Sequence, residues 1–503
     1  MENNFLWLYI LLSLIVLKLL ILNVGKLFKS KSSDKNTTSN LPPGPWKLPI
    51  IGSIHHLIGS LPHHRMRELS QKYGPLMHLQ LGETSVIVVS SKEIAQEVLK
   101  TNEVIFPQRP RSLGLEIVSY GCTDIAFSPY GEYWRQVRKI CTLELLSVKR
   151  VRSFQSIREE EVSKLIRYLS INKGSTINFT DEILAMTYNI ASRASFGDNC
   201  KDKEAYILFM KESMSVAESF TIHNLFPSQH WLHVITGMMH KLKRLHRSGD
   251  MFLQNIINNK VTKKTSEDGS LLSYLLNLKH DGSSNPDGFH LTINNIKAVI
   301  QTMLIGGSEP ASLTIQWAFS EMLKNPRVMK KAQEEVRQAF GSRGYVDEKD
   351  LQKLKFLKAV IKETLRLHPS NPIFPRECIE TCEINGYTIP AGTQVFVNSW
   401  AIGRDEKYWI EGEKFYPERF LDSPINFRGS NFEFIPFGAG KRMCPGISFA
   451  ASSIELPLAQ LLYSFDWKLP SGTTHENFDM TESFGATVKR KSDLFVIPIP
   501  YNP

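Results

Sequence analysis

One cysteine of this chain stands in a setting that suits metal-ligand chemistry. Cys444 follows the glycines Gly438 and Gly440 and precedes Gly446. The first two glycines allow a tight turn that carries the sulfur close to a flat ligand, and the third lets a helix begin nearby. A thiolate in such a loop can be stabilised by backbone amides and by a metal that it binds. The residues alone are equally consistent with a buried structural cysteine in a glycine turn.

The segment 437–446 resembles the haem-binding signature of the cytochrome P450 superfamily, Phe-x-x-Gly-x-Arg-x-Cys-x-Gly, at every specified position. The resemblance implies that Cys444 is the axial thiolate ligand of a haem b iron and favours O–O bond cleavage. It implies further that Phe437 packs beside the sulfur, that Arg442 pairs with a haem propionate, and that Gly446 belongs to the haem-binding loop. A guanidinium suits the propionate because it presents a planar fork of donors to a carboxylate.

Other motifs of that family occur in the right order along the chain. Glu363 and Arg366 fit its Glu-x-x-Arg helix, where a spacing of three puts both side chains on one face. Without the resemblance, such a pair is usually a solvated surface salt bridge. With it, Arg419 in a Pro-Glu-Arg-Phe element completes a structural triad behind the haem. The resemblance assigns three more haem contacts, Trp134, Arg138 and Arg376.

The helix expected over residues 291–324 departs from the family pattern. In the family its middle lies over the haem iron, with glycines that admit dioxygen and an acid and a threonine that organise proton delivery. Here the acid is Glu309, but the threonine position holds Pro310. Proline lacks an amide and clashes with the carbonyl four residues back, so we expect a kink as well as the loss of the hydroxyl.

Three outcomes of this substitution are open. Ser308 or Ser312, with water and Glu309, could replace the hydroxyl, so that ordinary hydroxylation of a terpenoid or alkaloid continues. A second outcome is substrate oxidation that ends without retained oxygen, as ring closure, desaturation or aromatisation. The third is turnover without dioxygen. We favour the second outcome, because the segment 306–310 resembles that of plant oxidases acting on indole alkaloids. A catalytically silent haem protein is a rival interpretation, against which Glu309 and the intact cysteine loop argue.

The resemblance also indicates a substrate class and a partner. The implied pocket is mostly apolar and suits a lipophilic plant specialised metabolite. Electrons from NADPH should arrive through a separate reductase, because the chain lacks a Rossmann Gly-x-Gly-x-x-Gly after a strand. Arg135, Lys139 and Lys441 could steer that acidic flavoprotein. Six residues are expected to contact the substrate, namely Leu304, Gly306, Ile373, Phe374, Ala486 and Thr487.

Hydrophobic periodicity predicts a mainly helical chain with a small sheet, as the resemblance to the superfamily also implies, and we expect residues 51–503 to form a single catalytic domain. No internal repeat divides it. The predicted helices are Lys92 to Thr101, Tyr133 to Glu144, Val151 to Leu169, Phe179 to Ser195 and Leu291 to Lys324. The predicted strands are Leu76 to Leu81, Val86 to Val89 and Thr393 to Asn398.

Residues 1–25 are predicted to be a membrane anchor. Phe5 to Leu22 is almost continuously apolar and, as a helix, about 27 Å long. A cleaved signal peptide is the alternative, but a basic leading region and a small-residue cleavage site are missing. Residues 26–50 form a basic linker and a proline-rich hinge. The positive-inside rule then places the body in the cytosol, so we expect a single-pass protein of the endoplasmic reticulum, in the plant microsomal A-type clade.

Composition excludes several other classes. The net charge of +10 comes partly from lysines of the linker, and no nucleic-acid-binding signature accompanies it, so nucleic acid is not an expected partner. The six cysteines show no CxxC spacing, which argues against a disulfide framework or a cysteine zinc site and fits a reducing compartment.

Overall fold

The structure, a computed structural model, describes residues 40–197, 203–216, 222–229, 231, 236–262, 269–280, 290–341 and 343–501. The predicted anchor over 1–25 and most of the linker over 26–50 lie outside these residues. Within them, no helix is both long enough and apolar enough to cross a bilayer.

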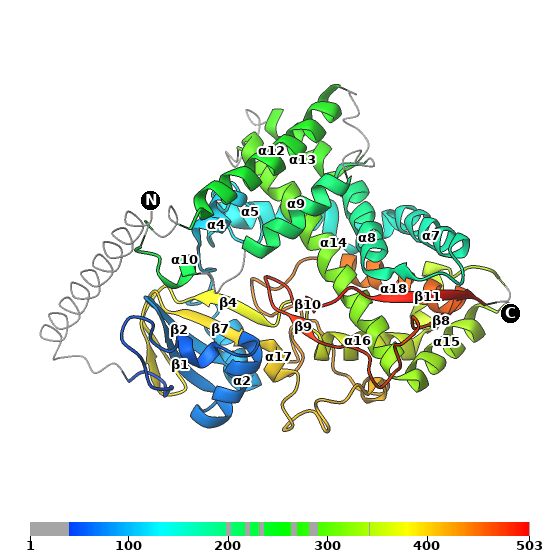
Figure 1. The fold of residues 1–503 in the computed structure, drawn as a ribbon. Coiled ribbons are helices and arrows are strands. Elements are labelled where there is room, and N and C mark those ends of the chain that lie inside the picture. The colour runs from blue at the N-terminus through cyan, green and yellow to red at the C-terminus, as the bar shows by residue number, and fades with distance from the viewer. Residues whose placement is uncertain are drawn as a thin grey trace, which may run out of the picture.

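Helices make up most of the described chain, around the long helix α14 (Ile293–Lys324), which crosses the middle of the molecule (Figure 1). Its first turn is closed by a capping box, in which Thr292 and Asn295 satisfy each other's backbone amides. Helices α8 (Phe179–Phe196), α16 (Lys355–Leu367) and α18 (Ile447–Ser464) pack against it. The others are α2 (Pro62–Tyr73), α3 (Lys92–Gln96), α4 (Leu113–Val118), α5 (Glu132–Cys141), α6 (Val148–Ser153), α7 (Gln155–Ile171), α9 (Lys203–Val216), α10 (Ile222–Leu225), α12 (Met238–Thr262), α13 (Leu271–His280), α15 (Pro326–Phe340) and α17 (Ser399–Ile402).

The predicted helices are confirmed, although the segments Glu97–Thr101 and Thr142–Leu146 are π-helical. The helix expected over 151–169 is divided into α6 and α7 at Phe154, whose backbone leaves the helical region. Helix α8 ends where Gly197 adopts φ +82°, a conformation that glycine reaches without steric cost. Helix α14 continues through Pro310 without interruption.

A four-stranded sheet lies beside the helical body, with α2 and α17 next to it (Figure 1). Its order is β1-β2-β7-β4, and the inner pair β2 and β7 is parallel while the outer pairs are antiparallel. Its strands are β1 (Leu76–Leu81), β2 (Thr84–Val89), β4 (Ile373–Glu377) and β7 (Gln394–Asn398). Three smaller antiparallel sheets consist of β3 (Ile177–Asn178), β8 (Phe465–Lys468) and β11 (Phe495–Pro500), of β5 (Cys382–Ile384) and β6 (Tyr387–Ile389), and of β9 (Glu482–Ser483) and β10 (Lys489–Arg490).

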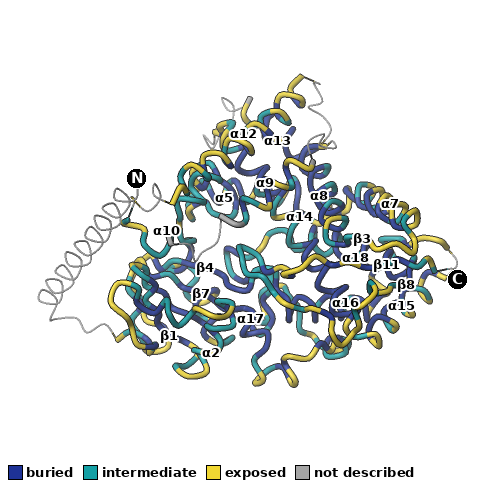
Figure 2. The backbone as a smooth tube through the Cα atoms, in the orientation of Figure 1, coloured by how far each residue is buried: buried dark blue, intermediate teal, exposed yellow. Residues whose placement is uncertain are grey.

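The apolar core follows this division. One large cluster of buried side chains fills the space between α14 and the helices around it, and two smaller clusters cover the faces of the four-stranded sheet. Figure 2 shows the buried backbone concentrated along α14, α8 and α18. Because α18 is part of the large core, the cysteine loop that precedes this helix lies against the same core.

Candidate active site

The loop that carries Cys444 is shaped by its glycines. Gly438 and Gly440 have φ +70° and +69°, in the left-handed region. A Cβ on Gly440 would lie 1.9 Å from the carbonyl oxygen of Leu99, so only a glycine fits between this loop and its neighbour. The backbone N–H of Cys444 donates to the carbonyl of Phe437 over 3.0 Å. These contacts fix the backbone from which the sulfur projects.

The thiol of Cys444 is enclosed by protein and yet faces open space. The residue is exposed, while desolvation by the surrounding protein raises the pKa of its thiol. Both observations hold if the sulfur faces an internal hollow. The backbone amide of Gly446 and the charges of Arg138 and Arg109 oppose this rise in pKa, so they favour the thiolate that a metal requires.

The middle of α14 lies beside the same region. A Cβ on Gly307 would lie 3.4 Å from a ring carbon of Phe449, near the start of α18. The adjacent Gly306 is exposed in the middle of a mostly buried helix, and nothing lies within 4 Å of the place where its Cβ would be. Gly306 therefore also faces open space, as the family pattern predicts for the oxygen side.

Four guanidinium groups lie close enough to influence one another near the thiol. Desolvation and the charges of Arg109 and Arg138 lower the pKa of Arg442 to about 9. Desolvation, with the charges of Arg109 and Arg442, holds the pKa of Arg376 well below its usual range. Nε of Arg109 and Nη1 of Arg442 are buried without a hydrogen-bond partner. The buried carboxylate of Asp124 offsets part of this positive charge.

This surplus of buried cationic donors fits a bound group with two carboxylates, such as the propionates of haem b. Unpartnered buried donors and unbalanced buried charges are costly, so a ligand that pairs with them is strongly favoured. Cys444 would hold the iron, and Arg109, Arg376 and Arg442 would hold the propionates. The chain therefore presents both ends of a haem site.

Trp134 makes two contacts within the protein. Its Nε1 donates to the carbonyl of Ile125 over 2.9 Å, so this donor is engaged here, and the direct contact with a propionate stays a prediction. The indole also lies under the guanidinium of Arg442, 4.3 Å from its ring centre. Arg138 likewise donates from its Nη2 to the carbonyl of Met443 over 2.6 Å.

The structure brings the predicted triad together. Arg366 donates to both carboxylate oxygens of Glu363 at 2.7 Å, and Nε of Arg419 adds a third bond at 3.0 Å. Glu363 and Arg366 are fully buried, which excludes the solvated surface salt bridge. The remaining donors of Arg366 reach the carbonyls of Gly403 and Gly412. The triad thus joins α16 to the irregular segment ahead of the cysteine loop.

Glu309 meets a hydroxyl that the sequence did not place there. Oγ1 of Thr487 donates to Oε1 of Glu309 over 3.0 Å, while Oε2 is buried without a partner. Desolvation raises the pKa of Glu309, so the carboxyl holds a proton more readily than an exposed acid does. Pro310 has no N–H to donate to the carbonyl of Gly306, which leaves that acceptor without its usual helical partner.

The two serines expected to replace the missing hydroxyl are engaged elsewhere. Oγ of Ser308 donates to the carbonyl of Leu304 over 2.6 Å, and the residue is fully buried. Oγ of Ser312 accepts a 2.8 Å bond from Gln316 and is also buried. Neither hydroxyl contacts Glu309, so Thr487 takes the place that sequence reasoning gave to them.

The predicted substrate contacts divide into two groups. Gly306, Ala486 and Thr487 keep accessible surface. Leu304 is fully buried in the helical core, and its contact with a substrate stays a prediction. Ile373 and Phe374 of β4 are buried in the clusters that flank the sheet.

The basic residues proposed to meet a reductase lie at the surface. Lys139 is exposed, Arg135 pairs with Glu132 at 2.7 Å, and Lys441 lies 3.6 Å from Glu103. Nearby acids thus reduce the net positive charge of the surface around Arg135 and Lys441.

Fold and site together define a mainly helical protein with a cysteine-ligated haem site. The family model for cytochrome P450 matches residues 42–495, and the chain belongs to that family. Its relatives include "Cytochrome P450 71D11" of Lotus japonicus, 53% identical over 92% of this chain and 96% of that protein. Premnaspirodiene oxygenase of Hyoscyamus muticus and 5-epiaristolochene 1,3-dihydroxylase of Nicotiana tabacum are each 48% identical over 95% of this chain and 96% of theirs.

Solved structures agree with this assignment. A zebra fish cytochrome P450 with progesterone superposes with a TM-score of 0.77 at 25% identity, over 88% of this chain and all of that one. The chain is thus a haem-thiolate oxidoreductase of the plant A-type clade, whose members use haem b, dioxygen and NADPH-derived electrons.

Two residues of the site were missed by sequence reasoning. Arg109 and Asp124 lie in irregular segments between helices and belong to no motif that we used. The available signal was weak: Arg109 stands between two prolines in a run with a second arginine, Arg111. Only the folded chain shows that Arg109 faces Cys444 and that Asp124 is buried beside it.

Proposed function

We propose that this protein hydroxylates a lipophilic terpenoid with retention of an oxygen atom from dioxygen. The contact between Thr487 and Glu309 carries the proposal, because it restores a hydroxyl beside the acid despite Pro310. It reverses our preference for an oxidation without retained oxygen, which depended on that hydroxyl being absent. The relatives named above support the substrate class, since premnaspirodiene and 5-epiaristolochene are, by their names, unsaturated hydrocarbons.

The chain's own residues supply proton handling and orientation. When bound, thiolate-ligated haem activates dioxygen for insertion into a C–H bond. Glu309 can take up and release a proton at its unpartnered Oε2, and Thr487 orients the carboxyl through Oε1. The carbonyl of Gly306, which Pro310 cannot serve as a donor, can accept a hydrogen bond from water or from a hydroxyl of the product. Apolar surroundings exclude bulk water and strengthen these contacts.

A second candidate is oxidation without retained oxygen, on an indole alkaloid or a related scaffold. Pro310 favours it, because the helical hydroxyl of the family pattern is gone from α14 itself. A silent haem protein is not favoured, since the cysteine loop, the arginines and Glu309 are all in place. The two oxidation candidates differ in the fate of the oxygen atom.

We propose further that residues 1–25 anchor the protein in the endoplasmic reticulum membrane, with residues 51–503 on the cytosolic side and the basic surface near Lys441 facing the reductase. The apolar segment of the sequence supports the anchor. Removal of these residues should shift the protein from the membrane fraction to the soluble fraction.

Labelled dioxygen tests the proposed reaction, with premnaspirodiene and 5-epiaristolochene as probes and reductase in excess. Retained label in the product supports hydroxylation, and an oxidised product without label refutes it.

Replacing Thr487 with valine removes the hydroxyl at nearly constant volume, so NADPH consumption should uncouple from product formation and peroxide release should rise several-fold. The matched control is Thr388→Val in the small β5–β6 hairpin, which forms a sheet of its own. Equal coupling in both variants would show that Thr487 has no part in proton delivery.

A further inference from the structure

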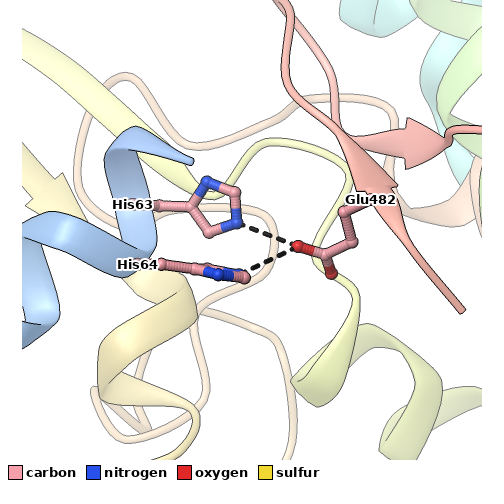
Figure 3. A group of neighbouring side chains, drawn as sticks. All are labelled: His63, His64 and Glu482. Atoms are coloured by element: carbon pink, nitrogen blue, oxygen red, sulfur yellow. Dashed lines mark hydrogen bonds and ion pairs between the residues drawn. The ribbon is translucent and has the colours of Figure 1, made fainter. Parts of the chain in front are cut away.

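Two histidines and a glutamate converge on one point outside the cysteine site. His63 and His64 lie in the first turn of α2, and Glu482 begins β9, more than 400 residues later (Figure 3). Nε2 of His63 lies 3.0 Å and Nε2 of His64 lies 3.1 Å from the same carboxylate oxygen, Oε2 of Glu482. The three atoms all lie within 4.8 Å of one another.

Aromatic neighbours hold both imidazoles in this orientation. The His64 ring stacks on Trp400, with centroids 4.2 Å apart and planes 29° apart. The His63 ring is fully buried between Trp400 at 5.1 Å and Phe484 at 5.6 Å. Because the rings are already fixed, a ligand that uses both nitrogens needs little further ordering of side chains.

A second layer of contacts orients the glutamate. Oε1 of Glu482 lies 3.4 Å from Nδ1 of His368, and Nε2 of His368 lies 2.7 Å from Glu321 of α14. His368 in turn stacks on Trp317, with centroids 4.1 Å apart and planes 2° apart. Outer contacts of this kind fix the direction of a ligating carboxylate in metal sites.

A cationic side chain near this point is engaged by other groups. Arg404 is bound by Glu413 at 3.1 Å and lies over the face of Trp400. Its charge is therefore partly balanced by a carboxylate other than Glu482.

The point of convergence is reachable from solvent. A pocket of about 740 Å³ opens beside it, lined by His64, Glu482, Trp400 and Thr481 among others. The side chain of His64 is 31% exposed. An ion could enter from this side and keep a water molecule as a further ligand.

We propose that His63, His64 and Glu482 bind one Zn²⁺ ion, through the two Nε2 atoms and Oε2, with water in the fourth position. Two imidazoles and a carboxylate are a common zinc donor set with an open position. Zinc bonds of about 2.0–2.1 Å separate tetrahedral ligand atoms by about 3.3 Å. The observed 3.0 and 3.1 Å contacts thus need a small expansion, and the two Nε2 atoms, which lie within 4.8 Å of each other, must adopt the same spacing. Each neutral imidazole carries its proton on Nδ1 once zinc takes Nε2.

The ion would join two distant parts of the chain. It links the start of α2 to the β9–β10 hairpin, whose turn carries Phe484 and Thr487. Zinc should therefore stabilise this hairpin and raise the thermal midpoint of the holoenzyme. Zinc binding does not depend on the proposed reaction, so failure of one leaves the other intact.

Zinc binding is measured on the full-length holoenzyme, in detergent, after removal of metals with a chelator. Wild type should bind one Zn²⁺ per haem, and X-ray absorption at the zinc edge should show two imidazole ligands and oxygen ligands. His64→Gln should weaken zinc binding by about 100-fold or more. The matched control is His56→Gln, since His55 and His56 are also adjacent histidines, with ring centroids 3.9 Å apart, but lie beside Trp46 and belong to no candidate metal group within the described region.

Each outcome decides the proposal. His64 is partly exposed, so its variant should fold, and an unchanged reduced carbon monoxide spectrum verifies this. Glu482→Gln is the second variant and should lose zinc in the same way. The proposal is overturned if wild type binds no zinc at micromolar free metal. It is also overturned if His64→Gln binds zinc with wild-type affinity and still shows two imidazole ligands. In either case the three residues would be linked by hydrogen bonds alone.

Discussion

Replacing Gly440 with alanine should damage the cysteine loop far more than replacing Gly438. Both residues have φ near +70°, so both variants carry the left-handed strain of about 1–2 kcal/mol. They differ in space. A Cβ at Gly440 would lie 1.9 Å from the carbonyl oxygen of Leu99, whereas a Cβ at Gly438 meets nothing within 4 Å.

The extra cost at Gly440 follows from that contact. Real Cβ contacts are essentially never shorter than 3.0 Å, so Leu99 or the loop must move by about 1 Å. The same point lies 3.0 Å from the Glu103 carboxylate, which accepts the N–H of Lys441 over 2.9 Å, so movement also disturbs this bond. Overpacking of this kind costs about 1–3 kcal/mol beyond the shared strain.

The assay is the fraction of purified chain that gives the reduced carbon monoxide band of thiolate ligation, followed through a urea titration. Gly438→Ala should lower the free energy of unfolding by the shared strain of about 1–2 kcal/mol, and Gly440→Ala should lower it by about 1–3 kcal/mol more or prevent haem retention. If the two variants unfold at equal urea midpoints, or if Gly438→Ala loses more stability, the reasoning is refuted. The close approach of Leu99 would then not be what requires glycine at position 440.

Three further predictions concern the same site. Cys444→Ser should abolish the thiolate-type band in the reduced carbon monoxide spectrum while the chain still expresses; a retained band would remove Cys444 as the ligand. Glu363→Gln leaves the buried charge of Arg366 uncompensated and should lower the free energy of unfolding in urea by about 3–5 kcal/mol, where a loss below 1 kcal/mol would contradict burial of the pair. Arg109→Gln should weaken haem retention about tenfold in an exchange assay with apomyoglobin, because a donor to the propionates is lost, while the exposed, ion-paired Arg135→Gln should retain haem normally.

Local sequence patterns predicted the helices and strands well but the site only in part. The strand Leu76–Leu81 has both of its predicted bounds, and helix α14 ends at Lys324 as predicted. These bounds could be predicted because hydrophobic periodicity and helix-end signals depend only on nearby residues. The pairing of Glu363, Arg366 and Arg419 came from motifs of the family. The contact between Glu309 and Thr487 could not be predicted, because it joins two segments 178 residues apart through a hairpin of irregular shape.

The directions in which Ser308, Ser312 and Leu304 point have a common physical origin. A helix turns about 100° per residue, so neighbours in sequence face different directions. Ser308 lies next to Glu309 in sequence, yet its hydroxyl bonds back to the carbonyl of Leu304 inside the core. Motif position gives the segment of a helix that lines a site, and the fold decides which of its faces does so.

The parallel pairing of β2 with β7 delays completion of the sheet while the chain is being synthesised. The two strands are separated by about 300 residues, and β7 completes the sheet only after most of the helical body has been made. At about 5–20 residues per second, the ribosome needs roughly 15–60 s to supply the missing strand. Throughout that time the β1–β2 hairpin presents an unpaired edge rich in valine and isoleucine, which other chains can join. Expression at reduced temperature or with additional chaperones should therefore improve the yield of folded protein more than a stronger promoter does.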